Sequence, residues 1–278
     1  MRGVDRPIAV ITGASSGIGA SFAEQLGARG CDLLITGRRE QILRTRAREL
    51  KERFGVGVQV LVGELTDPAV RAGLSDTVRN LPRIDWLVNN AGYGRGVAFT
   101  DDEYEEQRSL LSVHVEAIME LTHAAVARMP AGGRIITVSS LAGYGVSRRS
   151  AVYCASKAFA TSFTESLALE LAPRGIGVLA LLPGFTCSDF HRYEAVPKRN
   201  RGIVRWMPAE TVVRAALRAS DRGRIVCIPG GANRLLYLLL KLLPRTTVYR
   251  LMSGGVRKML AGDTGHSSSH STRPHPRS

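Results

Sequence analysis

The chain has 278 residues and a mass of 30.1 kDa, and 44% of its residues are hydrophobic. This supply of apolar residues can bury a sizeable core, so a chain that is disordered throughout is excluded. The formal net charge is +14, and residues 190–260 hold 15 basic and 3 acidic residues, a net +12. The positive field therefore belongs to the last third of the chain.

The cysteine and hydropathy patterns narrow the class of protein further. The four cysteines lie far apart with no CxxC pair, which argues against a disulfide framework and a zinc site. The N-terminal apolar run is too short for a secretory signal, and the run from Leu235 to Leu243 is about half the length that a bilayer requires. We therefore expect a cytoplasmic protein with at most peripheral membrane contact and no bound metal. The cysteines are Cys31, Cys154, Cys187 and Cys227.

Short apolar runs rich in β-branched residues recur along the chain, and segments of helical period separate them. Their continuous apolarity leaves no solvated face, which is typical of a parallel sheet covered by helices on both sides. The sequence therefore predicts a doubly wound α/β fold with seven parallel strands. We expect these strands at Ile8 to Thr12, Asp32 to Thr36, Val56 to Val62, Asp85 to Asn89, Arg134 to Ser139, Gly177 to Leu182 and Arg224 to Ile228.

The sequence predicts one domain followed by a short tail. No repeat and no Pro/Ser-rich linker interrupts residues 1–260, so we expect a single domain over residues 1–262. Residues 263–278 contain no apolar residue able to pack in a core, which predicts a disordered tail.

A glycine-rich turn, TGASSGIG over Thr12 to Gly19, links the first predicted strand to a helical segment. Such a turn lets backbone N–H groups and a helix N-terminus approach a pyrophosphate. Glycines also close tight turns, so the glycines alone are a weak signal that the flanking strand and helix strengthen. The residues expected to contact the nucleotide here are Gly13, Ser15, Ser16, Gly17, Ile18 and Gly19.

The end of the second predicted strand bears on the choice of nucleotide. An NAD site usually places an acidic residue there to bind the ribose 2′-OH, whereas this strand ends in Thr36-Gly37-Arg38-Arg39. A guanidinium suits a 2′-phosphate, so we expect NADP(H), bound by Arg38 with Arg39 and Ser15 in support. The alternative is that both are surface arginines of an Arg-rich protein.

Five motifs stand in order along the chain: TGASSGIG, NNAG at Asn89 to Gly92, Ser140 thirteen residues before Tyr153, Tyr153-x-x-x-Lys157, and Pro183-Gly-x-Thr186. In this order and spacing, residues 7–230 resemble the classical short-chain dehydrogenase/reductase family. Each motif is common, but the ordered set is highly specific. The resemblance implies a Rossmann-type fold and an NADP-preferring, ketoreductase-like oxidoreductase. It also implies cofactor contacts from Glu64, Leu65, Asn90, Ala91, Gly92, Tyr153, Lys157, Pro183, Gly184, Thr186 and Ser188.

The chemistry of a carbonyl reduction can be assigned to three of these residues. Hydride delivery to a carbonyl leaves an alkoxide that needs a proton, which the phenol of Tyr153 can donate. Lys157 lies one helical turn later, so its ammonium favours the tyrosinate form, and the resemblance implies that it also holds the nicotinamide ribose. Ser140 can donate a hydrogen bond to the substrate oxygen. Taken singly, Tyr153 and Ser140 could be ordinary helix and loop residues, but the coinciding spacings favour catalysis.

Two positions depart from the family pattern. His114 stands where the family has an Asn, on the helix before the fifth strand, that helps to carry a proton relay. An imidazole can bind a water molecule and titrates near neutral pH, so one hypothesis is a catalytic, pH-sensitive relay. A packed helix histidine with no catalytic part is the open alternative. Glu64 stands where the family more often has Asp beside the adenine, a change of one methylene that should alter fit and not function.

Substrate recognition is expected after the sixth strand, in residues 186–207. The apolar and cationic side chains of this segment and its neighbours favour a hydrophobic ketone that carries or is attached to an anion. A 3-oxoacyl thioester or a lipid-like keto ester is such a ketone. The apolar contacts are expected from Phe185, Phe190, Tyr193, Trp206 and Met207, with Phe99 and Tyr144 on one wall. The cations are Arg192, Lys198, Arg199, Arg201 and Arg205.

We expect residues 231–260 to form a helical extension. Its run from Leu235 to Leu243 is apolar nearly all round, so this run should pack against the domain, a second subunit or a membrane. Together with the net +12, it predicts contact with an acyl carrier or an anionic membrane surface. A homodimer or homotetramer is also expected. The alternatives are an NADP-binding regulatory protein with little turnover, a dehydrogenase of steroid-like or retinoid-like alcohols, and a nucleic-acid binder, for which the sequence has no aromatic platform or motif.

Overall fold

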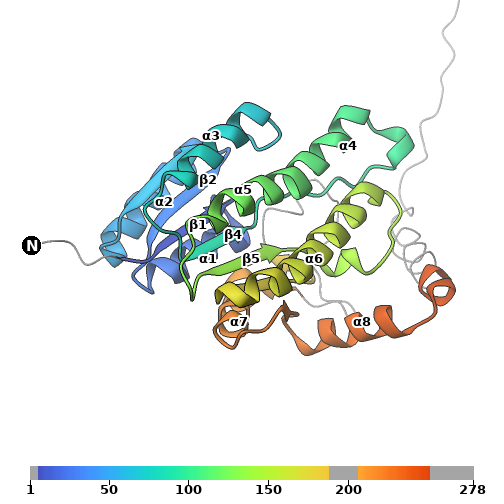
Figure 1. Ribbon diagram of the computed structural model, residues 1–278. Coiled ribbons are helices and arrows are strands. Elements are labelled where there is room, and N and C mark those ends of the chain that lie inside the picture. Colours follow the sequence, from blue (N-terminus) through green and yellow to red (C-terminus); the bar gives the residue numbers. More distant parts are fainter. Residues whose placement is uncertain (1–5, 188–205, 251–278) are drawn as a thin grey trace, which may run out of the picture.

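The computed structural model describes residues 6–187 and 206–250 (Figure 1). Within these residues one parallel sheet has seven strands in the order β3-β2-β1-β4-β5-β6-β9, which confirms the predicted fold class and strand number. The strands are β1 (Ile8–Thr12), β2 (Asp32–Gly37), β3 (Val58–Val62), β4 (Trp86–Asn89), β5 (Arg134–Val138), β6 (Gly177–Leu181) and β9 (Val226–Cys227). A smaller parallel pair joins β7 (Thr186–Cys187) to β8 (Met207–Pro208).

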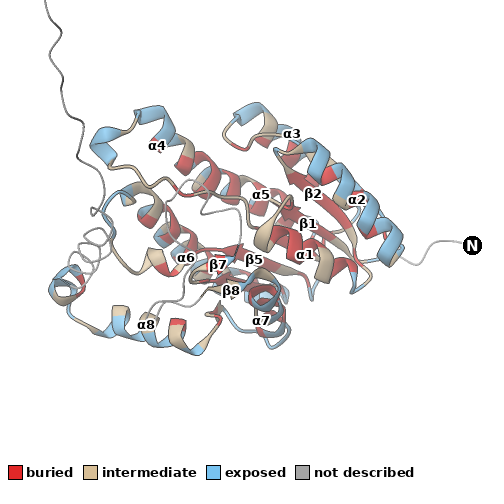
Figure 2. Cartoon of the chain, turned by 180° about the vertical axis from the view of Figure 1, so that it is seen from behind, coloured by how far each residue is buried: buried red, intermediate tan, exposed pale blue. Residues whose placement is uncertain are grey.

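Helices cover both faces of the seven-stranded sheet (Figures 1 and 2). Within the described residues, the labelled α-helices are α1 (Gly17–Gly27), α2 (Glu40–Phe54), α3 (Pro68–Arg79), α4 (Tyr104–Leu111), α5 (Ala117–Val126), α6 (Ala151–Leu171), α7 (Ala209–Asp221) and α8 (Gly231–Leu242), and residues 245–250 are also helical. Short 3₁₀ turns are η1 (Phe99–Asp101), η3 (Leu141–Gly143) and η4 (Ala172–Arg174), and η2 (Ser112–Glu116) is a π-helical turn between α4 and α5. None of the helices in the described part of the chain is long and apolar enough to cross a membrane.

The helix layers on the two faces of the sheet pack against alternate residues of the same strands. Ala9 and Ile11 of β1 pack into a core with α1, α2 and α7, whereas Val10 between them packs into a core with α3, α5 and α6. Successive side chains of a strand point to opposite faces, so a strand with helices on both sides must be apolar throughout. This is why the strands lack an alternating polar pattern, and Figure 2 shows them buried between the helices.

Local signals set the ends of several helices. The side chain of Asp67 accepts a hydrogen bond from the N–H of Ala69 at 2.8 Å, and Pro68 occupies the first position of α3. Gly55, with a φ of +64°, ends α2 in the left-handed region that favours glycine. Such caps fix where each connection between strand and helix begins.

The strand order reverses beside β1, which pairs with β2 on one side and β4 on the other. The loops that follow β1 and β4 therefore diverge at the carboxyl ends of the strands. A reversal of this kind leaves a crevice in which α/β proteins bind their ligands.

Candidate active site

A cavity of about 610 Å³ opens at the carboxyl ends of β1, β2, β4, β5 and β6. Most of the residues that we expected to bind cofactor or act in catalysis line it. Gly19 is buried beside the cavity, His114 is buried behind its wall, and Ser188 lies outside the described residues. The expected residues in the lining are Gly13, Ser15, Ser16, Gly17, Ile18, Arg38, Arg39, Glu64, Leu65, Asn90, Ala91, Gly92, Ser140, Tyr153, Lys157, Pro183, Gly184 and Thr186.

The glycine-rich turn has the shape that a pyrophosphate requires. Gly13 and Gly17 have φ values of +68° and +56°, in the region that favours glycine. A Cβ added at Gly13 would lie 2.9 Å from the Cα of Ala91, so a larger residue would displace the loop after β4. The helix α1 begins at Gly17 and points its N-terminus at the cavity wall, where its dipole and free N–H groups favour an anion. These features fit a dinucleotide.

The loop after β4 is bonded directly to this turn. The Oγ1 atom of Thr12 accepts hydrogen bonds from the backbone N–H groups of Asn90 and Ala91, each at 2.9 Å. The Asn90 amide donates to the carbonyl oxygens of Thr12 at 2.8 Å and Gly13 at 3.2 Å. Asn89 turns away and donates to Thr122 of α5 at 2.9 Å. The two loops that diverge at the sheet edge thus form one hydrogen-bonded unit.

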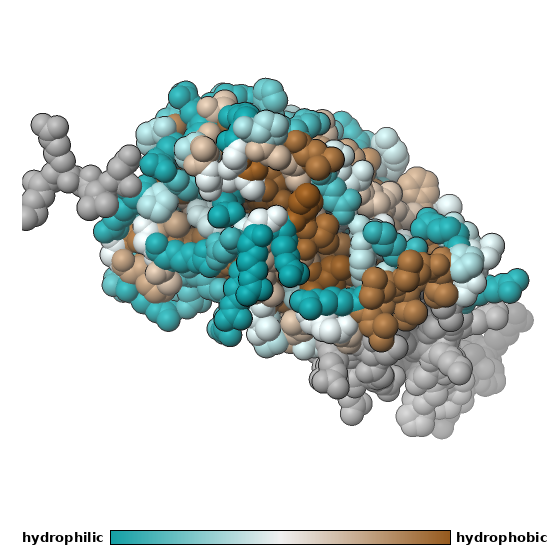
Figure 3. Space-filling view, turned by 60° about the horizontal axis from the view of Figure 1, so that its bottom comes forward, coloured by the Kyte–Doolittle hydropathy of each residue, from teal (hydrophilic) through white to brown (hydrophobic). Residues whose placement is uncertain are grey.

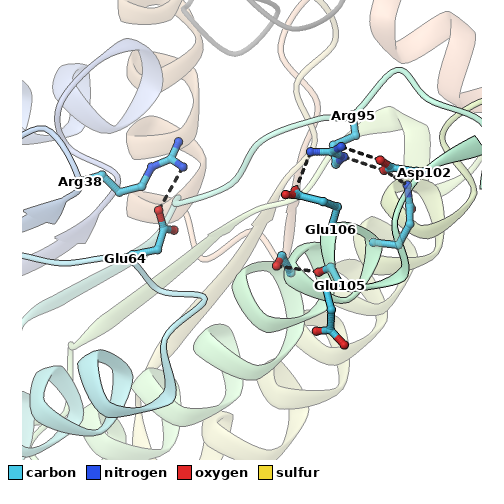
Figure 4. Close-up of polar contacts among 8 residues, drawn as sticks. Arg38, Glu64, Arg95, Asp102, Glu105 and Glu106 are labelled. Carbon is cyan, nitrogen blue, oxygen red and sulfur yellow. Dashed lines mark hydrogen bonds and ion pairs between the residues drawn. The ribbon is translucent and has the colours of Figure 1, made fainter.

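Two arginines lie on the cavity wall beyond the turn, in different environments. Arg38 forms an ion pair with Glu64 at 3.1 Å (Figure 4), and its guanidinium carbon lies 5.8 Å from the centre of the Tyr93 ring. Arg39 donates to the hydroxyls of Ser15 at 3.0 Å and Ser16 at 2.6 Å. A phosphate bound between them would compete with Glu64 for Arg38 and would meet Arg39 already held beside the glycine-rich turn.

A polar cluster fixes the far end of the loop that runs from β4 to α4 (Figure 4). Arg95 donates twice to the carboxylate of Asp102, at 2.7 and 2.6 Å, and once to Glu106 at 2.7 Å. Gln107 donates to the same Asp102 at 2.5 Å. The hydrogen bonds from Arg95 lower the pKa of the Asp102 carboxyl below its usual value. Sequence reasoning missed this cluster because its members belong to no motif.

Tyr153 and Lys157 lie on one face of α6, as their spacing requires. Lys157 is 3% exposed. Its ammonium donates to the carbonyl oxygen of Val138 at 2.9 Å and lies 5.8 Å from the centre of the Tyr153 ring. Burial lowers its pKa to about 8. At neutral pH the ammonium is therefore mostly charged and lies where it can favour a tyrosinate.

The two neighbouring serines at the end of β5 have different surroundings. The Ser139 hydroxyl is buried, donates to the carbonyl oxygen of Lys157 at 2.8 Å and contacts Thr161 at 2.7 Å, so it joins β5 to α6. The Ser140 hydroxyl accepts from the N–H of Ala142 at 3.1 Å and faces the cavity. An accepting hydroxyl keeps its own proton available for a substrate oxygen.

His114 lies in the π-helical turn η2 and is 0% exposed. Its Nε2 accepts from the N–H of Tyr93 at 3.1 Å, and its Nδ1 lies 3.0 Å from the Ser156 hydroxyl, which donates to the carbonyl oxygen of Tyr153 at 2.8 Å. Burial lowers its pKa well below the usual value. Burial disfavours the imidazolium, which favours the alternative of a packed histidine. A catalytic part for His114 stays a prediction.

The substrate side of the cavity differs in part from the expected wall. Of the aromatic and Met contacts that lie in the described residues, Phe185 lines the cavity, and Trp206 packs behind it with ring centres 5.3 Å apart. Tyr144 stacks edge to face on Tyr237 at 4.8 Å, and Phe99 is 54% exposed on η1. Met207 packs into the core next to α7. Phe190, Tyr193, Arg192, Lys198, Arg199, Arg201 and Arg205 lie outside the described residues.

One wall comes instead from α8. Asn233, Leu236 and Leu240 of this helix line the cavity, and Asn233 donates to the carbonyl oxygen of Pro229 at 2.8 Å. The sequence signal for this wall is weak, because a helix that is apolar nearly all round does not reveal which face turns inward.

The four cysteines lie in different surroundings. Cys31, Cys154 and Cys227 are buried, and burial raises the pKa of the Cys31 and Cys227 thiols to about 11. Cys154 lines the cavity next to Tyr153, and Cys187 is exposed. Within residues 6–187 and 206–250, no three His, Cys, Asp or Glu side chains lie together as a metal would require.

Comparison with known proteins agrees with this geometry. Residues 7–197 match the family described as short chain dehydrogenase. The chain is 34% identical over 205 residues to 3-oxoacyl-[acyl-carrier-protein] reductase FabG of Escherichia coli K12, covering 73% of this chain and 82% of that protein.

Two solved structures resemble the chain along most of its length. One is a short-chain dehydrogenase from Sphingobium yanoikuyae in complex with NADPH, with a TM-score of 0.75 and 29% identity. The other is the bulky-bulky ketone specific alcohol dehydrogenase from Comamonas testosteroni, with a TM-score of 0.72 and 30% identity. Each covers 95% of this chain and 98% of its own. The matched family, the sheet order and the residues around the cavity agree: the chain belongs to the classical short-chain dehydrogenase/reductase family and is an NAD(P)-dependent oxidoreductase acting on the CH–OH/C=O pair.

Proposed function

We propose that this protein reduces an apolar ketone to a secondary alcohol with NADPH. The observation that carries the proposal is the continuity of one cavity. It runs from the glycine-rich turn and the two arginines, past Ser140, Tyr153 and Lys157, to the apolar side chains of α8. The 3-oxoacyl reductase and the bulky-ketone dehydrogenase among its relatives support a carbonyl substrate with an apolar part.

The chain's own residues divide the reduction between them. Bound nicotinamide would supply the hydride to the carbonyl carbon. The Ser140 hydroxyl donates a hydrogen bond to the carbonyl oxygen as negative charge develops there, and the Tyr153 phenol delivers the proton. The buried Lys157 ammonium stabilises the tyrosinate that remains. Lys157 would also hold the ribose hydroxyls of the cofactor, and Thr186 would hold its carboxamide. Ser188, which lies outside the described residues, is a further expected contact of the carboxamide.

The preference for NADPH rests on Arg38 and Arg39, which both face the cavity. Arg39 is held by Ser15 and Ser16, and Arg38 can exchange its contact with Glu64 for a 2′-phosphate. A charge-assisted bond of this kind contributes about 1.5 to 3 kcal/mol, which is roughly ten- to a hundredfold in affinity.

The apolar lining narrows the substrate class. Phe185, Leu141, Leu236 and Leu240 offer no partner for the hydroxyls of a sugar, whereas an acyl or lipid-like chain would bury its surface against them. A 3-oxoacyl ester or thioester is the substrate class we favour. Presentation on an acyl carrier, a dimeric or tetrameric assembly and a cytoplasmic location remain predictions.

The test is turnover. Purified protein is mixed anaerobically with NADPH and a panel of free ketones and 3-oxoacyl thioesters of increasing chain length, and the loss of NADPH absorbance is followed. We expect kcat/KM to rise with chain length. If NADPH binds but no ketone is reduced, the protein is a regulatory nucleotide binder. If only steroid-like or retinoid-like alcohols react, in the oxidative direction, the dehydrogenase alternative holds.

A further inference from the structure

We propose that α8 is a membrane-binding helix, which docks the mouth of the cavity on an anionic lipid surface so that the ketone enters from the lipid. Only the second part of this inference, the entry of the ketone from the lipid, rests on the proposed function. The docking itself rests on the two faces of α8 and on its charges.

One face of α8 belongs to the site. Asn233, Leu236 and Leu240 follow one another at helical spacing and line the cavity, and Leu236 and Tyr237 pack on the small core formed with Leu141. Figure 1 shows the helix at the lower edge of the molecule, apart from the layers that cover the sheet. It is therefore a wall between the cavity and the exterior.

The opposite face of α8 is apolar and exposed. Leu235, Leu238, Leu239 and Leu242 stand at positions i, i+3, i+4 and i+7, which places them in one stripe. Their exposed fractions are 52%, 48%, 41% and 76%. Figure 2 shows α8 mostly exposed, and Figure 3 shows a broad apolar patch on the side of the molecule that carries it. Exposing a contiguous apolar stripe to water is unfavourable, so a stripe of this kind marks an interaction surface.

The charges around the stripe select the partner. Residues 231–250 contain Arg234, Lys241, Arg245 and Arg250 and no acidic residue, and all four cations are exposed. Arg234 and Lys241 lie seven residues apart, on the same flank of the helix. A second copy docked on this stripe would bring like charges together, whereas anionic headgroups would neutralise them while their acyl chains cover the leucines.

The length of α8 fixes its orientation. Twelve residues of helix are about 18 Å long, too short to span a bilayer. The helix must therefore lie in the plane of the surface, with the leucine stripe toward the acyl chains and the cavity on its other side. An apolar ketone in the lipid would then reach Leu236 and Leu240 without crossing bulk water.

The test is co-sedimentation of the full chain, without substrate, with vesicles of phosphatidylcholine alone or mixed with phosphatidylglycerol. We expect at least tenfold more bound protein on the anionic vesicles, and loss of binding in 1 M salt because screening shortens the Debye length to about 3 Å. The triple variant Leu235→Gln, Leu238→Gln and Leu242→Gln should lose binding. The matched control is Leu169→Gln, at a leucine of α6 that is 70% exposed.

Charge is tested in the same way. Lys241→Glu with Arg245→Glu should abolish binding, whereas Arg48→Glu with Lys51→Glu on α2 should not. The proposal is overturned if the wild type ignores anionic vesicles, if the triple variant binds as well as the wild type, or if that variant converts a dimer into a monomer on a sizing column.

Substrate entry is measured separately from the proposed function. The triple variant touches no residue of the cavity lining, so it should reduce a short water-soluble ketone at the wild-type rate. With a long-chain ketone dissolved in anionic vesicles, its kcat/KM should fall at least tenfold. Equal rates on the vesicle substrate overturn the entry route, whereas no turnover of either ketone by the wild type counts against the proposed function.

Discussion

The Nε2 atom of His114 accepts a hydrogen bond from the backbone N–H of Tyr93, 3.1 Å away. An accepting nitrogen carries no proton, so the neutral ring must hold its proton on Nδ1 and donate it to Ser156. His114 thus links the loop after β4 to Ser156, whose hydroxyl donates to the carbonyl oxygen of Tyr153 on α6. Both ring nitrogens have a hydrogen-bond partner.

The first prediction concerns pH. Because burial lowers the pKa of His114, reduction should show no inflection between about pH 5.5 and 7.5, where an ordinary histidine titrates. Activity should fall at alkaline pH as Lys157, with a pKa near 8, loses its charge. Steady-state rates from about pH 5 to about pH 10 check both statements.

His114→Asn, which restores the residue type usual in the family, should leave the shape of that pH profile unchanged. His114→Ala leaves the Tyr93 N–H without its partner and should lower the free energy of unfolding by about 1 to 3 kcal/mol. A wild-type inflection near pH 6.5 that disappears in His114→Asn would show that the imidazole is a relay after all.

The second prediction separates proton donation from cofactor binding. Tyr153→Phe should lower kcat for ketone reduction by at least about a thousandfold while NADPH still binds, because the phenol delivers the proton but does not build the nucleotide site. Lys157→Ala should lower both kcat and the affinity for NADPH. Fluorescence titration with NADPH and turnover distinguish the two variants. Tyr144→Phe, at a tyrosine outside the cavity lining, is the control and should retain activity.

The third prediction concerns the nucleotide. Arg38→Ala and Arg39→Ala should each reduce the preference for NADPH over NADH roughly tenfold or more, with little effect on NADH turnover. Glu64→Gln removes the carboxylate that competes for Arg38 and should tighten NADPH binding severalfold. Arg48→Ala on α2 is the control. Equal use of both nucleotides by the wild type would contradict the assignment.

The fourth prediction concerns acid stability. Hydrogen bonds from Arg95 lower the pKa of Asp102, so this pair stabilises the fold fully above the ordinary Asp pKa of about 3.9 and loses its effect as pH falls through the lowered value. Asp102→Asn should therefore lower Tm at pH 7. The difference from the wild type should shrink below about pH 4. A difference that is the same at both pH values would show that the pair acts through packing alone.

The sequence predicted the strands and most cavity residues because their signals are local. A strand buried on both faces must be apolar throughout, and a nucleotide turn must combine glycines with a following helix. Contacts between distant residues carry no such signal. His114 bonds to residues 21 and 42 positions away, and Arg38 to one 26 positions away. The inward face of α8 was equally hidden, because leucines cover nearly its whole circumference.

The hydroxyl of Thr12 accepts hydrogen bonds from the backbone N–H groups of Asn90 and Ala91, in the loop after β4. The Asn90 side chain donates two hydrogen bonds to the carbonyl oxygens of Thr12 and Gly13, in the turn after β1. The loop is therefore ordered when the protein folds and not when it meets its ligand. The loop therefore loses little conformational entropy when a ligand binds, so a dinucleotide should bind this half of the cavity without rearranging the loop.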